Sequence, residues 1–356
     1  MQIATTINDI EFSNYPQSLV IDGIAGETVG VKAYISTSLI LDVTLTASDS
    51  RATVEGFGSL ITRYMEIAQA THATIKVELL TGSTISVTKE WIAIYQRDML
   101  LHPVASWLQS HFLTIGKIRN ILPAVESIYF FNDEDLEQTS QDANVTLRAY
   151  IINDDDSLTE STSTAGIIDE VVLSDASHDY MLYHFYVDMM AIAASANVSL
   201  DKIAAVAVEY KSRRMFYYRT DNYDIALRYL SSFGYEEVIG IPGTTEKKIS
   251  DSRQTALVGG RLIAYDNLQS FDYEFESAWL SQAEIKRAVE CMRSRSVSLI
   301  DGTPITISKI DTEISDEKGK AQRVKFTYRY ADGTQPIAGG VHDDNIFSQQ
   351  YDINFD

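Results

Sequence analysis

The chain has 356 residues, of which 45% are hydrophobic and 22% are charged, a composition typical of folded globular proteins and not of disordered chains. At roughly 100 to 200 residues per domain, this length predicts two or three domains, and we expect three. The formal net charge of -21 disfavours nucleic acid and anionic lipid surfaces as partners, because it repels phosphate groups.

Membrane insertion and secretion are not expected. No window approaches the ~20 apolar residues of a membrane-spanning helix, and the N-terminal segment lacks both the basic and the apolar region of a signal peptide. We therefore expect synthesis in the cytoplasm without a signal peptide. Cys291 is the only cysteine, so an intrachain disulfide is excluded, and its apolar helical surroundings predict a buried thiol.

The first expected domain, residues 1–138, is β-rich with one helix crossing it. Alternating apolar residues predict one hairpin in residues 29–46 and another in residues 73–95. Between them, the sequence GFGSLITRYMEIAQA at residues 56–70 has helical spacing, and Ser59 is its expected N-cap. The domain is therefore predicted to place a single amphipathic helix between two hairpins.

Residues 98–138 are predicted to form an irregular bridge that closes this domain. Acidic runs at residues 133–137 and 154–156 invite comparison with calcium-binding loops. Such a loop of the EF-hand type needs oxygen ligands at alternate positions, a central glycine and a terminal glutamate, and neither run has that pattern. We interpret both runs as solvated hairpin loops.

The second expected domain, residues 139–234, is predicted to be an antiparallel β-sandwich. Strand-like runs recur at intervals of roughly ten residues, and the last of them form a hairpin in which residues 211–214 join AVAVEY to MFYYRT. The run YMLYHFYV at residues 180–187 carries aromatic residues at both parities, which favours a strand buried on both faces. His184 lies inside that run and is interpreted as structural.

The third expected domain, residues 235–356, is predicted to be α+β. Residues 271–277, FDYEFES, alternate as a half-buried strand does. Ser281 and Glu284 have the spacing of a capping box, so a helix is expected to begin there, and strands resume after residue 296. Its buried face is expected to carry Ile285, Val289 and Met292. The predicted fold class is thus mainly β with α+β elements, in antiparallel β-sandwich-like modules with short helices in the first and third domains.

Signatures of catalysis, of cofactor binding and of metal binding are missing from the sequence. The histidines at positions 72, 102, 111, 178, 184 and 342 never have the spacing that builds a metal site on one strand or helix. No phosphate-binding or nucleophile motif surrounds the glycines, and we interpret Gly56, Gly58, Gly259 and Gly260 as sites of bulges or close backbone approach. We therefore expect no enzyme, no metal and no cofactor.

Four stretches carry a resemblance to a known group of proteins. They are SWLQSHFLTIGKIRN at residues 106–120, MFYYRTDNYDIALRYLSSFGYEEVIGIPG at 215–243, SRQTALVGGRLIAYDNLQSFDYEFESAWLSQAEIKRAVE at 252–290 and RVKFTYRY at 323–330. In these the chain resembles uncharacterised β-rich proteins encoded among the tail genes of prophages in Bacteroides-type bacteria. The resemblance implies a structural component of the virion, of the tail-tip or baseplate type, and it brings no functional residues.

The C-terminal stretch suggests an arm for assembly. After Gly339 and Gly340, the residues Tyr351, Ile353 and Phe355 alternate with polar residues, which predicts a short strand with one apolar face. A strand this short needs an exposed sheet edge, which either its own third domain or a neighbouring subunit supplies.

Two functional hypotheses follow from these observations. The first is a structural tail protein that forms homo-oligomers and binds other tail proteins. The alternative is a carbohydrate- or receptor-binding surface module that uses some of the 20 tyrosines as a stacking surface for a cell-surface glycan.

Overall fold

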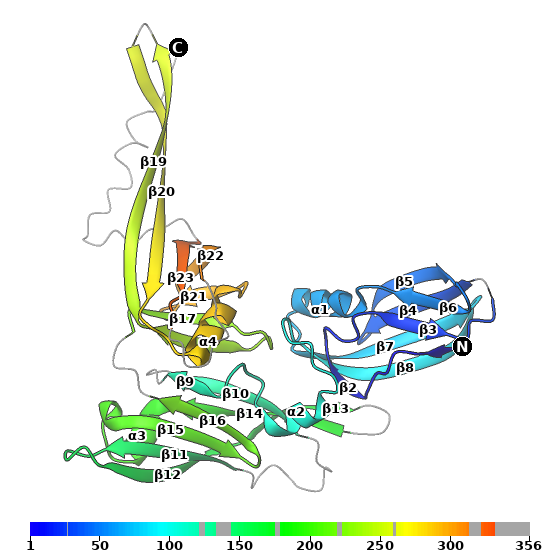
Figure 1. Cartoon of the computed structure of the whole chain (residues 1–356), viewed down its shortest axis with the longest axis horizontal. Helices are drawn as coiled ribbons and strands as arrows, with labels where there is room; N and C mark the ends of the chain where they lie inside the picture. The colour runs from blue at the N-terminus through cyan, green and yellow to red at the C-terminus, as the bar shows by residue number, and fades with distance from the viewer. Residues whose placement is uncertain are drawn as a thin grey trace.

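The computed structural model describes residues 1–26, 28–120, 125–132, 144–174, 179–218, 223–258, 261–312 and 322–331. These residues form five β-sheets with four short α-helices, grouped in three modules, which confirms the predicted mainly β fold class (Figure 1). In the described part of the chain, no helix is both long and apolar enough to cross a membrane.

The first module packs two sheets and one helix around a single core. Its elements are β1 (Gln2–Ile3), β2 (Ile10–Phe12), β3 (Leu19–Asp22), β4 (Thr28–Ile35), β5 (Ser38–Thr46), β6 (Arg51–Val54), α1 (Phe57–Ile67), β7 (His72–Thr81) and β8 (Thr84–Ile94). The sheet orders are β2-β8-β7-β4-β5 and β1-β3-β6, and β2 runs parallel to β8. Both predicted hairpins are present, because alternating apolar residues such as Val31 and Val77 are buried against α1 and the smaller sheet.

Helix α1 begins three residues earlier than predicted. Gly56, not Ser59, is its N-cap, with a φ of 68° and no side-chain cap bond. The left-handed backbone at this position favours glycine over a residue with a Cβ. Gly58 then lies where a Cβ would stand 2.2 Å from the carbonyl oxygen of Asn14. The expected close backbone approach is therefore found at Gly58, but at a helix start and not inside a strand.

The second module is a sandwich of a five-stranded and a three-stranded sheet. Its elements are α2 (Ala105–Ser110), β9 (Ile118–Asn120), β10 (Val125–Asn132), β11 (Asn144–Ile152), β12 (Leu158–Gly166), β13 (Ile168–Ser174), β14 (Asp179–Asp188), α3 (Met189–Ser195), the 3-10 helix η2 (Leu200–Lys202), β15 (Ile203–Tyr210) and β16 (Arg213–Tyr218). The sheet orders are β12-β11-β15-β16-β9 and β10-β14-β13, with β9 parallel to β16. As predicted, β14 is a central strand buried on both faces, with His184 inside it.

Two local expectations in this module were wrong. The hairpin β15–β16 turns through Lys211 and Ser212 alone, because Tyr210 pairs with Arg213 and places both arginines in the strand. The buried Arg213 guanidinium donates to the carbonyls of Leu108 and Phe131 at 2.7 and 2.5 Å. A helix, α3, also follows β14, because the Asp188 carboxylate caps the amides of residues 190 and 191.

The third module is one seven-stranded sheet covered by a helix. Its elements are β17 (Ile225–Leu230), β18 (Glu236–Ile241), β19 (Gly243–Val258), β20 (Arg261–Ser277), α4 (Gln282–Met292), β21 (Val297–Leu299), β22 (Pro304–Ile310) and β23 (Lys325–Tyr330), in the order β18-β17-β21-β22-β23-β20-β19. The predicted capping box is confirmed: the Glu284 amide donates to Ser281 Oγ, and the Ser281 amide donates to the Glu284 carboxylate. Ile285 and Met292 are buried as expected, and Val289 is half-buried.

The strand pairings move both expected domain boundaries. The bridge at residues 98–138 contains β9 and β10, which belong to the two sheets of the second module. The boundary expected between residues 234 and 235 would divide the β17–β18 hairpin. Strand β17 pairs with β18 and β21 because Leu227 and Tyr229 pack into the core of the third module.

A shared apolar cluster, here called the hub, joins the three modules. It contains Ile10, Phe12, Ile92 and Ile94 of the first module, Val104, Leu108, Leu113, Phe131 and Leu182 in or next to the second, and Phe233 and Tyr235 of the third. The Trp107 ring lies 5.5 Å from the rings of both Phe12 and Phe233. One continuous apolar core therefore links all three modules.

Candidate assembly site

The most distinctive feature of the structure is the long two-stranded hairpin β19–β20, here called the ribbon. Its two strands pair with each other from Gly243 opposite Ser277 to Val258 opposite Arg261, with one register shift. Strand β23 pairs with β20 only at residues 273–276, so the ribbon beyond them has no further strand beside it within the described residues. At about 3.3 Å per residue, residues 248–258 carry it roughly 35 Å beyond the sheet. Figure 1 shows the ribbon projecting away from the three modules.

The root of the ribbon is braced on both faces. On one face, the Tyr273 and Tyr328 rings stack 5.2 Å apart, and the Lys247 ammonium lies 5.8 Å from the Tyr273 ring. On the other, Lys248 pairs with Glu274 at 2.6 Å, and the Arg329 guanidinium forms a bidentate pair with the Asp272 carboxylate. These contacts fix the direction in which the ribbon leaves the module.

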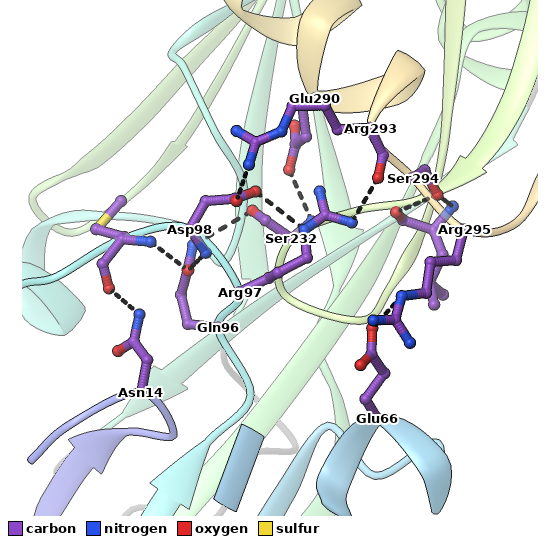
Figure 2. A network of polar contacts seen from close by, with 12 residues as sticks. Asn14, Glu66, Gln96, Arg97, Asp98, Ser232, Glu290, Arg293, Ser294 and Arg295 are labelled. Carbon is purple, nitrogen blue, oxygen red and sulfur yellow. Dashed lines mark hydrogen bonds and ion pairs between the residues drawn. The ribbon is translucent and has the colours of Figure 1, made fainter. Parts of the chain in front are cut away.

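The third module is also tied to the first by polar contacts, drawn in Figure 2. The Arg293 guanidinium pairs with Asp98 at 3.0 Å, and the Arg295 guanidinium pairs with Glu66 of α1 at 2.8 Å. The Arg97 amide donates to the Ser232 carbonyl, also at 3.0 Å. Since Arg293 and Arg295 directly follow α4, these bonds hold the helix that covers the ribbon-bearing sheet.

Between the second and third modules lies a buried cluster of charges. Arg119 of β9 is 1% exposed and donates to Glu126 of β10 at 2.8 Å, and it pairs with Glu237 of β18 at 2.9 Å. Arg287 of α4 is 2% exposed and lies 3.6 and 3.5 Å from the same two carboxylates. Tyr217 donates to Glu126 at 2.7 Å. Two arginines thus share two carboxylates across the boundary between the modules.

The electrostatics of this cluster favour charged arginines and a charged Glu237, and they disfavour the charged form of Glu290. Burial alone would lower the pKa of Arg119, but the charge of Glu237 and its other neighbours raise it well above the usual value. Burial would raise the pKa of Glu237, and the Arg119 and Arg287 charges instead bring it below its usual value. Burial and the Glu237 charge raise the pKa of Glu290. Glu290 also accepts from the Ser232 amide at 2.7 Å, so the cluster reaches the contacts with the first module.

Cys291 and His184 are placed in the fold, whereas several other predicted features lie outside the described residues. Cys291 is fully buried in α4, and burial raises the pKa of its thiol, as expected for a structural cysteine. His184 is buried, with its ring 5.3 Å from that of Tyr129. Tyr351, Ile353 and Phe355 of the expected arm lie outside the described residues, as do His178, His342 and the acidic run at 133–137.

The described residues contain no cluster of metal ligands, but they form an open groove in the second module. Across the described ranges, no group of three or more His, Cys, Asp or Glu side chains is placed to hold a metal ion. A groove of about 360 Å³ opens between β12, β14 and α3 of the second module. Its walls include Ser163, Thr164, Ser195 and the ring of Tyr186, which is 50% exposed.

Comparison with known proteins adds little. No family model and no curated protein matches the chain. Solved structures that match include two of the plexin A4 full extracellular region, spanning domains 1 to 8 and domains 1 to 10. Each is 8% identical with a TM-score of 0.20 over 92% of this chain, which spans 39% and 31% of the two plexin chains. Likeness at this level carries no argument about fold or function.

Proposed function

We propose that this chain is a non-enzymatic structural subunit of a phage or prophage tail, of the tail-tip or baseplate type. It assembles with copies of itself and with other tail proteins. The observation that carries the proposal is the ribbon, which extends roughly 35 Å beyond its sheet without a neighbouring strand in the described residues. The resemblance of four stretches to prophage tail proteins supports the same function.

Physical chemistry favours an assembly role for such a ribbon. An isolated two-stranded hairpin is marginally stable in water, because its conformational entropy is offset by few contacts. A long unpaired edge also offers a row of backbone donors and acceptors to another chain. A projecting ribbon with an unpaired edge suits an assembly in which a neighbour completes the structure.

Shortening the ribbon tests this proposal. In the variant, Lys248 is joined to Asp272 through Asn-Gly, which replaces residues 249–271 by a two-residue hairpin turn. We expect the full chain to show a light-scattering mass that is a multiple of 39.8 kDa, and the variant to be monomeric while keeping a cooperative thermal unfolding transition. Assembly through the ribbon would be contradicted if the full chain were monomeric, or if the variant formed oligomers with as many subunits as the full chain.

Glycan binding is a second candidate function, favoured by the groove of the second module. Sugar rings stack on exposed aromatic faces, and their hydroxyls form hydrogen bonds with polar side chains. The groove offers both kinds of group, because it is lined by Tyr186 together with Ser163, Thr164 and Ser195. Tyr186→Ala should abolish any signal on a glycan array. Tyr64→Ala removes a comparably exposed ring from the first module and should leave it unchanged. Equal signals from both variants would reject the groove as the site.

A further inference from the structure

We infer that the ribbon of one copy adds its β19 edge, antiparallel, to the β12 edge of a second copy. The inference rests on the proposed assembly function and names the surface that receives the ribbon. Strand addition at an open edge supplies main-chain hydrogen bonds along the whole contact, so it needs no preformed pocket. The donor edge, the acceptor edge and their charges each support this pairing.

The donor edge is regular. Strand β19 is the last strand of its sheet, so its outer side faces no other described strand. The one register shift in the ribbon lies where Gln254 pairs with Asp266 and Thr255 pairs with Ala264. The extra residue, Tyr265, is therefore on β20, and β19 continues without a bulge. Residues 250–258 thus form an unbroken nine-residue edge.

The acceptor edge is equally regular and has the same length. Among the described strands, β12 pairs with β11 alone, and the register runs without a shift from Asn144 and Gly166 to Ile152 and Leu158. Its sequence, LTESTSTAG, contains no proline and no lysine, the residues that usually protect an edge. Its residues are exposed or half-buried throughout.

Strand β5 is the other described nine-residue edge, and it is less suitable. There, Ala33 pairs with Leu41 and Tyr34 pairs with Leu39, which leaves Ile40 as an extra residue on β5 itself. A bulge on the edge strand bends it and interrupts the row of donors and acceptors. Strand β5 is thus a control of matched length that lacks the regular edge.

Charge sets the direction of the pairing. The exposed Arg261 lies opposite Val258 at the outer end of the ribbon, whereas Asp251 lies near the inner end of the nine-residue edge. The turn that leads into β12 contains three consecutive aspartates, residues 154–156, all exposed. In an antiparallel arrangement, the end of β19 at Val258 lies beside the start of β12 at Leu158, which brings the basic tip to this acidic turn.

The symmetry of the assembly follows from this pairing. If two ribbons paired with each other, neither tip would reach the acidic turn at residues 154–156. A ribbon on β12 reaches that turn and joins two different surfaces. A contact between different surfaces is heterologous, so it repeats from copy to copy and closes into a ring or continues as a filament. Closed rings or open filaments are therefore the expected products.

Disulfide trapping tests the inference in the full chain. The donor copy carries Gln254→Cys, which the expected register places opposite residue 162. The acceptor copies carry Ser161→Cys, Thr162→Cys or Ser163→Cys, and this panel covers a register shift of one residue in either direction. The native Cys291 is fully buried and does not compete. We expect mixed donor and acceptor samples to form crosslinked dimers at one or more panel positions. Thr44→Cys on β5 is the matched acceptor control and should give none.

The outcomes separate this inference from the proposed function. Crosslinks between two donor copies, or to Thr44→Cys in place of the panel, would overturn pairing with β12. An oligomer that stays intact by light scattering while no panel position crosslinks would also overturn pairing with β12. In each of these cases the proposal of self-assembly would remain supported. A chain that is monomeric by light scattering would overturn both.

Discussion

Arg119→Met should lower the free energy of unfolding by about 3 to 5 kcal/mol, because it leaves buried carboxylates without their strongest partner. Arg119 holds Glu126 at 2.8 Å and Glu237 at 2.9 Å, while Arg287 is more than 3 Å from both. Glu237 is 4% exposed, so water cannot replace the lost arginine. The expected readout is a fall in melting temperature on the order of 10 °C in the transition that includes the second and third modules.

Arg51→Met is the matched control for this substitution. Arg51 forms a bidentate pair with Asp22 at 2.6 and 3.0 Å, a geometry at least as good as that of Arg119. Its side chain is 62% exposed, so water and salt screen the pair. We expect no resolvable change in melting temperature. Equal effects of the two substitutions would show that burial does not decide the strength of these pairs, and that the junction is not held by its charges.

Sequence reasoning succeeded where one short stretch contains the whole signal. The capping box at Ser281 and Glu284 is complete within four residues, and the predicted helix begins there. The hairpins of the first module alternate because one face of each strand meets the core, and residues such as Val31 and Val77 record that burial. Local sequence therefore predicted fold class and several elements, including the buried strand around His184.

The ribbon was missed because it meets no core over most of its length. Only its root at residues 271–277 shows the apolar alternation of a half-buried strand, and only this part was predicted. Beyond the root, no apolar period distinguishes a strand from a polar loop. The sequence signal for the ribbon is Gly-Gly at 259 and 260, a dipeptide favoured in two-residue hairpin turns. Segments long enough to form two paired strands flank this dipeptide.

The charge cluster could not be predicted from local sequence for a different reason. Arg119, Glu126, Glu237 and Arg287 come from β9, β10, β18 and α4, and only the packing of two modules brings them together. In sequence, each resembles a solvated surface residue, the commonest situation for these types. The domain boundaries failed likewise, because β17 follows the hairpin β15–β16 in sequence but pairs with β18 and β21 in space.

Gly58→Ala should destabilise the first module by about 2 kcal/mol, although alanine is the better helix former. Helix propensity favours alanine over glycine by roughly 1 kcal/mol, whereas forcing a Cβ into a packed contact costs up to about 3 kcal/mol. The added Cβ would lie 2.2 Å from the carbonyl oxygen of Asn14 and 2.9 Å from that of Pro16. Both are backbone atoms, so a change of side-chain rotamer cannot relieve the clash.

The backbone around the clash cannot move away without breaking other bonds. Asn14 Nδ2 donates to the Met99 carbonyl at 2.5 Å, and the neighbouring Ser13 amide donates to the Ile94 carbonyl at 2.8 Å. On the helix side, the Phe57 amide donates to the Gln17 carbonyl at 2.8 Å. Gly26→Ala is the control, since its Cβ would meet no atom within 4 Å. A melting temperature for Gly58→Ala at or above that of Gly26→Ala would show that α1 shifts freely, and that the first module is not locked to the hub through residues 13–17.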